Sequence, residues 1–323
     1  MYKKIVVCCS HAVTGGPEVL HQLVHALRSY GHDARICYYP FDVPFQCPEA
    51  YKRYNAPADT FCDEDGTLTV IPEAATWIRK KIRKARCAIW WLSVDNYFQR
   101  RGESALSDFL APWKSLARGR RAALSDLRDC LHLAQSHYAA SFLQRLNIRS
   151  ELLTDYLAAE HLTDLSELRD RRNIAVYNPK KGATRTQKLI SNHPDVEFVP
   201  IRNMTAAQVA DLLRSAKIYV DVGNHPGKDR LPREAAMAGC CVITGMRGAA
   251  GNPRDIPIPP DFKIDDSSSV YVKQFRSAAE HVFGDFAEHS ARFDGYRRSI
   301  LREPHLFLQQ VRSIFGVVGH RSQ

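Results

Sequence analysis

The sequence lacks several features that would place it in a specialised class of protein. None of its apolar runs reaches the length of about eighteen residues that a transmembrane helix needs. The apolar stretch in MYKKIVVCCSHAV is too short for a signal peptide. The nine cysteines never form a Cys-x-x-Cys pair, and no low-complexity segment or short-period repeat occurs. We therefore expect a reduced, cytoplasmic, globular protein.

Positive charge is the main departure from an average composition. The 323 residues carry a formal net charge of +10, and a chain of this length accommodates two domains with their own cores. Such a charge favours anionic partners: nucleotides, acidic glycans, anionic lipid surfaces or nucleic acid. Nucleic acid is disfavoured because no recognition helix, aromatic RNA-binding strand or zinc-ligand spacing appears. Each dense basic cluster is also typical of a solvated helix face; the clusters are Arg79–Arg86, Arg118–Arg121 and Arg169–Arg172.

The first half of the chain alternates between strand and helix patterns. Three apolar runs are predicted to be strands, and CAIWWLSV has the continuous apolar character of a strand buried on both faces. These runs are Ile5–Cys9, Ala34–Tyr39 and Cys87–Val94. The stretch 41–66 is predicted to be a loop, and HLA a short strand followed by a helix with Ser136 as its N-cap. Helices are predicted at Glu18–Tyr30, Pro72–Arg86, Ala105–Arg121 and Leu124–His132.

The same alternation restarts after Arg172. Strands are predicted in NIAVYNP, VEFVPI, KIYVDVG and CCVITG, with helices at Thr184–Asn192, Thr205–Ser215, Pro232–Ala238 and, interrupted by Pro304, Asp285–Phe315. Repeated strand–helix units predict an α/β protein with two Rossmann-like, doubly wound domains facing across a cleft. We expect domains at 1–165 and 166–285, with C-terminal helices at 286–323 that cross back to the first domain.

The segment YVDVGNHPGKDRLPREAAMAGCCVITG is the strongest candidate for a binding site. A strand is followed by a loop with glycines and then by a helix that starts near Pro232. Lys228 and Arg230 stand before this helix, whose free N–H groups favour an anion such as a diphosphate. Glu234, expected in the first turn, is suited to bond a ribose hydroxyl pair or to interact with the helix dipole.

A second basic loop, YNPKKGATRTQK, follows the first strand of the same half. Lys180, Lys181 and Arg185 surround Gly182, and ligands of open α/β sheets bind beyond the carboxyl ends of strands. Two such loops are expected to share one polyanionic ligand, with Arg247 in a third glycine-rich turn closing the site. A lysine-rich turn without a ligand is the alternative.

Two motifs resemble the GT-B glycosyltransferases, especially the retaining family 4 (group 1). Gly15-Gly16-Pro17-Glu18 precedes a leucine-spaced helix, Gly31-His32 and a strand, and LPREAAMAGCCVI matches the family's later element. The resemblance covers most of Tyr2–Asp265. It implies that Gly15 and Gly16 let backbone approach the donor diphosphate or the acceptor. It also implies that Lys181, or equally Lys180, binds the diphosphate and that Glu234 binds ribose.

The sequence also departs from the family pattern. Pro226 occupies the position of the family's first glutamate, and neighbouring His225 is a candidate to take over its contact with the donor sugar; capping of the glycine loop is the alternative role. The N-domain histidine is missing from WWLSVDNYF. There Asp95 is a candidate to hold a sugar hydroxyl or to act as base if the reaction inverts, or else a loop cap.

The resemblance implies transfer of a sugar from a nucleoside-diphosphate sugar to a glycan or lipid-linked glycan, in cell-surface polysaccharide synthesis. The transfer is expected to retain configuration and to need no metal or other cofactor, since no Asp-x-Asp cluster follows a strand and Asp265-Asp266 is expected at the surface. The basic helix Arg79–Arg86 is a candidate contact with anionic lipid at the inner membrane face. One alternative is a GT-B epimerase or hydrolase using Glu18 or Asp95; another is a degenerate, transferase-like scaffold subunit.

Overall fold

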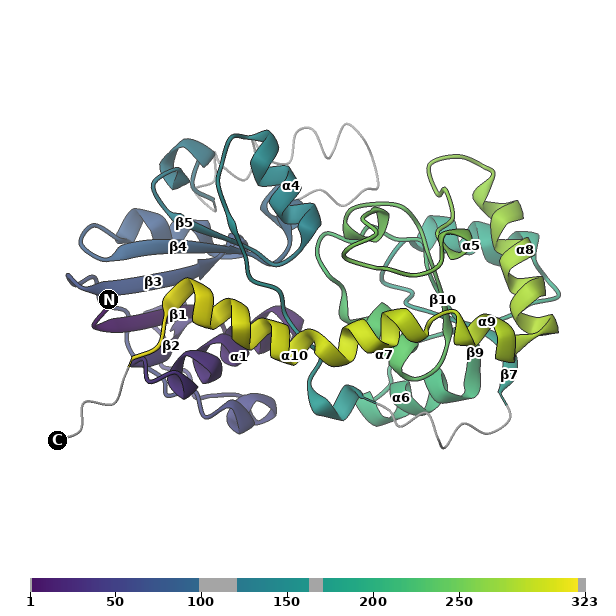
Figure 1. The fold of residues 1–323 in the computed structure, drawn as a ribbon, viewed down its shortest axis with the longest axis horizontal. Coiled ribbons are helices and arrows are strands. Elements are labelled where there is room, and N and C mark those ends of the chain that lie inside the picture. The colour runs from purple at the N-terminus through teal and green to yellow at the C-terminus, as the bar shows by residue number, and fades with distance from the viewer. Residues whose placement is uncertain (1, 99–120, 163–170, 319–323) are drawn as a thin grey trace. The chain divides into compact units, whose positions relative to one another are not determined.

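The chain forms two compact units. The computed structural model describes residues 2–98, 121–162 and 171–318. The N-terminal unit joins Met1–Asp155 to His305–Gln323, and the C-terminal unit is Tyr156–Pro304. Each unit is built on one parallel sheet covered by helices (Figure 1). The prediction of an α/β protein with two Rossmann-like units is confirmed.

The N-terminal sheet has the strand order β2-β1-β3-β4-β5-β6, and every neighbouring pair is parallel. Its strands are β1 (Lys4–Ser10), β2 (Ala34–Tyr39), β3 (Thr67–Pro72), β4 (Arg86–Trp91), β5 (Leu131–Ala134) and β6 (Glu151–Leu152). Successive residues of a strand point to opposite faces of the sheet. Accordingly Trp90 stacks on Phe307, while Trp91 belongs to the core cluster on the other face with Ile78 and Leu143. Both tryptophans are fully buried.

Short helices connect these strands. They are α1 (Gly15–Ser29), α2 (Val94–Phe98), α4 (His137–Arg145) and the 3-10 helices η1 (Glu49–Tyr54), η2 (Glu73–Lys81) and η3 (Leu124–Leu127). The predicted cap of α4 is confirmed, because the Ser136 hydroxyl accepts the N–H of Ala139. Gly15 and Gly16, predicted as a loop, are the first two residues of α1. Their backbone N–H groups therefore stand at a helix N-terminus.

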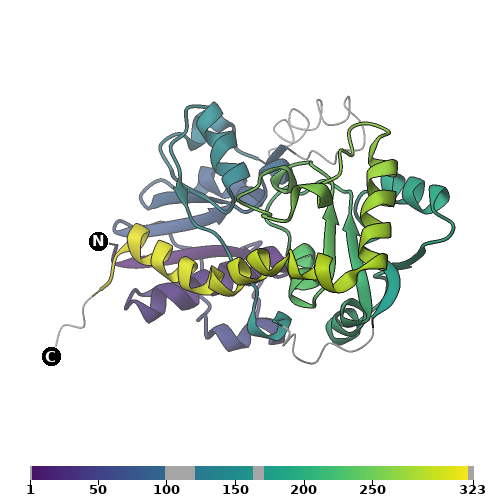
Figure 2. The ribbon, with the colours of Figure 1, turned by 45° about the vertical axis from the view of Figure 1, so that its right-hand side comes forward.

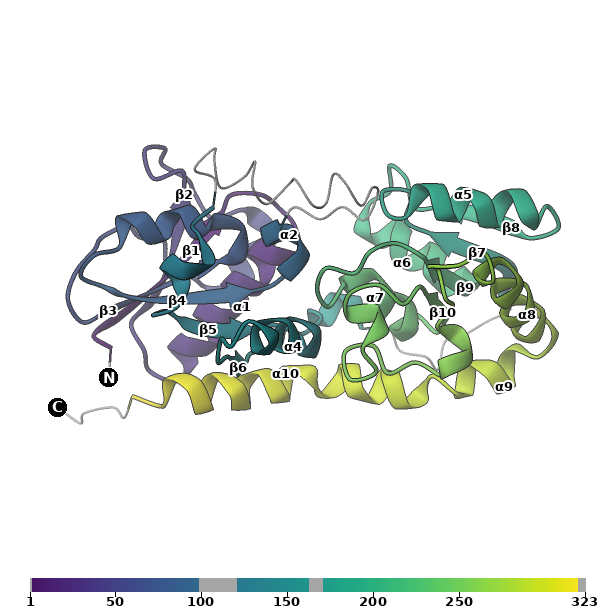
Figure 3. The ribbon, with the colours of Figure 1, turned by 90° about the horizontal axis from the view of Figure 1, so that it is seen from above.

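The C-terminal sheet has the order β10-β9-β7-β8, again all parallel. Its strands are β7 (Arg172–Tyr177), β8 (Glu197–Pro200), β9 (Ala216–Asp221) and β10 (Cys241–Thr244). Helices α5 (Ala183–Asn192) and α8 (Tyr271–Gly284) pack together, as do α6 (Ala206–Ser215) and α7 (Arg230–Met237), one pair on each face of the sheet (Figures 1 and 3). Thr205, where the helix was predicted to start, is the N-cap of α6 and forms a full capping box with Gln208.

The chain ends in α9 (Phe286–Ala291) and the long helix α10 (Asp294–Phe315), drawn in yellow in Figure 2. The interruption predicted at Pro304 is wrong: α10 runs through it. Proline removes only one backbone N–H from the hydrogen-bond ladder of the helix. The turns on either side of Pro304 are packed: Ile300 lies in the core of the C-terminal unit, and Phe307 lies in the core of the N-terminal unit. Among the described residues no helix has the length and apolar character needed to cross a membrane.

The basic segment Arg79–Arg86 is not the predicted helix. It comprises the end of η2, a turn, and the first residue of β4. The Asp63 carboxylate accepts the backbone N–H groups of Arg83, Lys84 and Ala85, so a side chain rather than a helical ladder satisfies this turn.

Two further predictions for the N-terminal half need correction. Strand β3 was missed, because its alternating Thr67-Leu68-Thr69-Val70 lies between a loop-like stretch and an apparent helix. The helix predicted over Leu124–His132 is only the short η3, followed by the start of β5. The predicted helix Ala105–Arg121 and the basic clusters at 118–121 and 169–172 lie wholly or mostly outside the described residues.

In both sheets the first four strands of the unit lie side by side in the same order: second, first, third, fourth. The order reverses between β1 and β3 and between β7 and β9. Ligands of open α/β sheets bind in the crevice beyond the carboxyl ends of the strands at such a reversal. This places one candidate site in each unit, after β1 and β3 and after β7 and β9.

Candidate functional site

Three loops converge at the carboxyl edge of the C-terminal sheet. A Cβ atom added to Gly182, whose φ is +57°, would lie 2.7 Å from the backbone nitrogen of Gly223. A Cβ atom added to Gly248 would lie 2.0 Å from the carbonyl oxygen of His225. Only glycine allows the backbones to approach this closely. The loops, which follow β7, β9 and β10, are 178–182, 222–229 and 245–248.

Lys181 lies at the centre of these loops in a group of four charged side chains. Its ammonium is 2.5 Å from Oδ2 of Asp229 and 3.5 Å from Oδ2 of Asp221. His225 bridges the same two carboxylates, with Nδ1 2.8 Å from Asp229 and Nε2 3.5 Å from Asp221. We call Lys181, Asp221, His225 and Asp229 the charge quartet. Asp221 ends β9 and Lys181 follows β7, so the quartet stands at the reversal of strand order.

Asp229 stands at the start of α7. Asp229 occupies the N-cap position of α7, yet its side chain makes no capping hydrogen bond. Its carboxylate is committed to Lys181 and His225 instead. Because α7 begins at Arg230, Glu234 is its fifth residue and lies in the second turn, not in the first turn as predicted.

The quartet shifts the pKa of each of its members. Burial alone would lower the pKa of His225, but the Asp221 carboxylate raises it to about 9, with Asp229 adding to this effect and Lys181 opposing it. Burial alone would raise the pKa values of Asp221 and Asp229, but the neighbouring cations hold both low. The pKa of Lys181 is raised, since its two carboxylates outweigh its burial. At neutral pH two cations therefore face two carboxylates.

A second cluster joins two arginines through one carboxylate. Nε of Arg185 lies 3.5 Å and Nε of Arg247 3.1 Å from Oδ2 of Asp266. Asp266 also accepts the backbone N–H of Met246, and it is buried, so the prediction that it lies at the surface is wrong. Both arginines remain about one-third exposed, with relative accessibilities of 27% and 30%. Two arginines therefore share this one carboxylate at the sheet edge.

A third cluster ties the loop before α7 to α10. Lys228 lies 2.5 Å from Oε1 of Glu303, and Arg233 lies 2.8 Å from Oε2. Arg233 is fully buried and also donates to the carbonyl oxygen of Lys228. Lys228 therefore takes part in a structural ion pair, and it is also a candidate for the anion site.

Glu234 and Arg230 form the last ion pair of this edge. Nε of Arg230 lies 2.8 Å, and Nδ1 of His161 3.1 Å, from Oε1 of Glu234. Lys180 differs from the other candidates, because its side chain is exposed and no ion pair of its ammonium occurs among the described residues. The structure therefore brings together Lys181, Arg185, Lys228, Arg230 and Glu234 around one sheet edge, with Lys180 at its surface.

The candidates in the N-terminal unit lie at the reversal between β1 and β3. Gly15 and Gly16 open α1, and no atom lies within 4 Å of the place where a Cβ of Gly15 would be. Pro17 has no N–H, the Glu18 N–H bonds to the carbonyl of Thr14, and Gly15 and Gly16 are partly exposed. The Glu18 carboxylate is buried and pairs with Arg53 and Tyr54.

Two predicted catalytic residues are buried rather than open to a substrate. His225 has no exposed surface, and both ring nitrogens face carboxylates of the quartet. This geometry does not support a direct contact between His225 and a donor sugar. Asp95 is buried in α2 and accepts a hydrogen bond from the Tyr138 hydroxyl. Both residues were predicted because they stand where the resembling family has functional residues, and packing turned their side chains inward.

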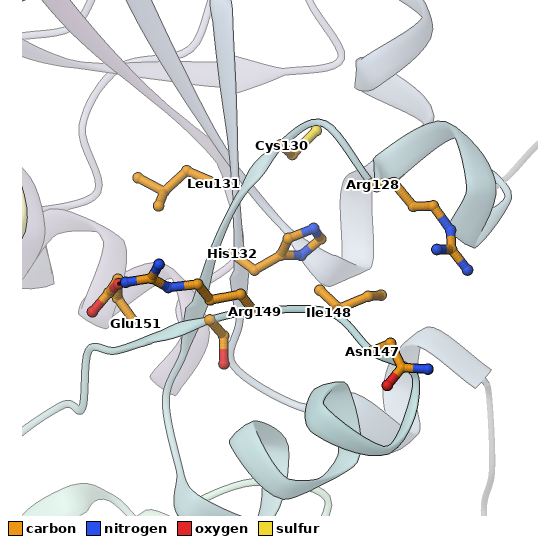
Figure 4. A pocket seen from close by; sticks show the side chains of 9 residues that line it. Arg128, Cys130, Leu131, His132, Asn147, Ile148, Arg149 and Glu151 are labelled. Atoms are coloured by element: carbon orange, nitrogen blue, oxygen red, sulfur yellow. Dashed lines mark ion pairs between the residues drawn. The ribbon is translucent and has the colours of Figure 1, made fainter.

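A separate cavity of about 430 Å³ lies at the amino-terminal ends of β5 and β6, away from the predicted residues (Figure 4). Its lining includes Arg128, Leu131, Ile148 and Arg149, and the two arginine side chains point in different directions. His132, on its wall, is fully engaged: Nδ1 accepts the indole N–H of Trp91, and Nε2 donates to a backbone carbonyl. No group in this cavity resembles the convergent charges of the C-terminal sheet edge.

The sequence matches no protein-family profile and none of the curated proteins. Solved structures match it over nearly its whole length. A sucrose-phosphate synthase from Thermosynechococcus elongatus has a TM-score of 0.66 at 10% identity, covering 97% of this chain and 98% of that one. WaaG, a glycosyltransferase involved in lipopolysaccharide biosynthesis, has a TM-score of 0.62 at 12% identity, covering 97% and 100%. A glycosyltransferase from Rickettsia africae has 0.61 at 11% identity, covering 99% and 100%.

The chain has the GT-B fold. This confirms the fold that the two sequence motifs predicted, while the narrower resemblance to family 4 stays a prediction. Several residues at the sheet edge of this GT-B chain were not predicted from the sequence as members of the site: Asp221, Asp229, Arg233, Asp266, Glu303 and His161. Asp221 carried a usable signal, as the one charged residue at the carboxyl end of an apolar strand. Asp266 and Glu303 carried none, because only folding brings them to the loops.

Proposed function

We propose that this protein is a glycosyltransferase that moves a sugar from a nucleoside-diphosphate sugar to a glycan or lipid-linked glycan. One observation carries the proposal: Lys181 and the Arg185–Asp266–Arg247 cluster converge at the reversal of strand order in the C-terminal sheet. A diphosphate is the ligand that such an arrangement of cations suits.

The donor diphosphate binds along the three glycine loops. Lys181 meets it through the exposed part of its side chain, while its two carboxylates fix the direction of the ammonium. Arg185 and Arg247 pair with Asp266 and remain partly exposed, and we propose that they also contact phosphate oxygens. Glu234 accepts hydrogen bonds from the ribose hydroxyls, with Arg230 and His161 holding its carboxylate.

Charge stabilisation supplies the chemistry. Breaking the bond between the sugar and the diphosphate builds positive charge on the sugar ring and negative charge on the leaving group. Preorganised cations stabilise that leaving group, each well-placed donor being worth about 2–4 kcal/mol. We propose that these cations make a metal unnecessary. We also propose that the acceptor enters on the leaving-group face and is deprotonated by the diphosphate, so that the transfer retains configuration.

The acceptor is proposed to bind to the N-terminal unit near Gly15 and Gly16. The first backbone N–H groups of a helix such as α1 are suited to hydroxyl or phosphate oxygens of a glycan or lipid-linked glycan. The structurally similar WaaG acts in lipopolysaccharide biosynthesis. By analogy, synthesis of a cell-surface polysaccharide is the pathway proposed here.

Peripheral binding to an anionic membrane face is proposed for the basic turn. Lys80, Lys81, Arg83, Lys84 and Arg86 are exposed, and Asp63 fixes the turn that presents them. Flotation with vesicles containing phosphatidylglycerol tests this: we expect binding that is lost in high salt and in the Arg83→Gln, Lys84→Gln variant. Binding that ignores both changes, or no binding at low salt, contradicts it.

Calorimetry with a panel of UDP, GDP, ADP and, as outlier, CMP tests the function. We expect one nucleoside diphosphate to bind with micromolar affinity with and without added Mg²⁺. Lys181→Ala should weaken this binding at least about tenfold, equivalent to ~1.4 kcal/mol, and Glu234→Gln should also weaken it. Lys217→Ala, at the opposite end of β9, is the matched control and should bind normally.

The outcomes separate the alternatives. Absence of binding by every nucleotide favours the degenerate scaffold. Turnover of a nucleotide sugar without any acceptor favours an epimerase or hydrolase. Equal binding by the Lys181→Ala and Lys217→Ala variants places the nucleotide elsewhere.

A further inference from the structure

We propose that His225 is a positioning residue that balances the charge of Asp221 and Asp229 and thereby holds Lys181 ready for the donor diphosphate. The inference rests on the proposed function, because it assigns a role to a residue of the same sheet edge. It differs from the role predicted for His225 from the sequence, which was direct contact with the donor sugar.

The loop after β9 holds His225 in a fixed position. His225 has no exposed surface, its carbonyl oxygen accepts the N–H of Ala249, and it forms a bridge to Gly248. The loops after β9 and β10 are thus joined at this residue. A side chain held this firmly acts only on the groups that surround it.

Charged groups from three elements surround the imidazole of His225. Asp221 approaches from the end of β9, Asp229 from the N-cap of α7 and Lys181 from the loop after β7. The Tyr219 hydroxyl, 3.4 Å from Oδ2 of Asp221, is neutral at physiological pH, because burial raises its pKa. These groups supply two negative charges and, apart from His225, one positive charge.

Loss of the imidazolium changes the net charge of the quartet. With His225 protonated the quartet is neutral, and the pKa of about 9 keeps it so at neutral pH. A neutral residue at 225 leaves two buried carboxylates facing one ammonium. That surplus negative charge sits beside the place where the diphosphate binds and repels it. It also draws Lys181 further towards Asp221 and Asp229, away from the ligand.

The experiment measures the affinity of the nucleoside diphosphate identified by calorimetry for the full chain, from pH 6.5 to pH 10. For the wild type we expect constant affinity to about pH 8 and then a decline with a midpoint near 9, the pKa of His225. His225→Gln should bind about tenfold more weakly at pH 7, the fold-change equivalent to ~1.4 kcal/mol, and should lose this decline. Because ionisation of the nucleotide affects both proteins alike, the difference between their profiles reports on His225.

A charge-balanced double variant separates electrostatics from packing. His225→Gln with Asp221→Asn restores a neutral cluster while the amide oxygen at 221 still accepts the N–H of Gly223. We expect the double variant to regain most of the affinity that His225→Gln loses. His193→Gln is the control for removing a buried histidine in the same unit, where Nδ1 bonds only to a backbone carbonyl.

Two results overturn the inference while leaving the proposed function intact: parallel pH profiles in the wild type and His225→Gln, or a double variant that binds more weakly than His225→Gln. If the wild type binds no nucleoside diphosphate, the proposed function itself fails. Thermal unfolding of each variant shows whether it is folded under the conditions of the titration.

Discussion

Nδ1 of His225 lies 2.8 Å from Oδ2 of Asp229, and the same carboxylate oxygen meets the ammonium of Lys181. Asp229 thereby links a fully buried imidazole to a partly exposed lysine at the carboxyl edge of the sheet. A residue in the N-cap position ordinarily bonds the first N–H groups of its helix. In this protein that side chain instead fixes the direction of a cation that we propose binds the donor diphosphate.

The stability of the protein should fall between pH 6.5 and pH 9 because of His225. Its pKa is raised by folding from 6.5 to about 9, so over this range the folded state holds a proton that the unfolded state has released. The contribution is complete below pH 6.5, is lost as the pH rises through 9, and is on the order of 3 kcal/mol. Urea unfolding of the wild type and of His225→Gln at several pH values measures it. A constant difference between the two proteins across this range would contradict the assignment.

Replacing Gly182 by alanine should destabilise the protein by about 2 kcal/mol or more, because its φ is +57° and its Cβ would meet the backbone of Gly223. Gly15→Ala is the contrasting variant. No atom lies within 4 Å of its Cβ position, so its unfolding free energy should stay within about 0.5 kcal/mol of the wild type. Denaturant unfolding compares the two, and equal losses would contradict the packing described for the glycine loops.

Asp266→Asn should weaken both stability and nucleotide binding. The change leaves Arg185 and Arg247 without their shared carboxylate. Because both arginines are partly exposed and stay hydrated, we expect a loss of about 1–3 kcal/mol. Asp265→Asn is the matched control, since the Asp265 carboxylate bonds only nearby serines on the surface. Thermal unfolding and calorimetry check both variants. Similar behaviour of the two neighbours would argue against the arginine cluster.

Glu73→Gln should become more stable than the wild type as the pH rises from 4.5 to 7. Burial raises the pKa of Glu73 to about 7, although the N–H of Leu92 and the charge of Arg121 oppose this. Folding therefore favours the protonated form of Glu73. Its contribution to the free energy of unfolding, on the order of 3 kcal/mol, is lost as the pH rises through 7. Glutamine does not ionise, so the gap between the two proteins should open over this range in urea unfolding. A gap of the same size at pH 4.5 and pH 8 would show that the carboxyl is not the cause.

Much of the C-terminal unit was predictable because its elements are set by local patterns. The apolar runs at β7, β9 and β10 are strands, and the helix predicted to start at Thr205 has that residue as its N-cap. The N-terminal unit was harder. Strand β3 alternates threonine with apolar residues, and the basic turn after η2 depends on Asp63, some twenty residues earlier in the chain.

Local sequence patterns specify the α/β alternation, the glycine loops after the strands and the cations beside them, because backbone sterics and hydrophobic periodicity act over a few residues. Which carboxylate each cation meets depends on folding. Asp266 reaches Arg185 and Arg247, and Glu303 reaches Lys228 and Arg233, across long separations in sequence. The burial of His225 was decided in the same way. Burial and charge pairing depend on where loops from different strands come together, and no local pattern records that.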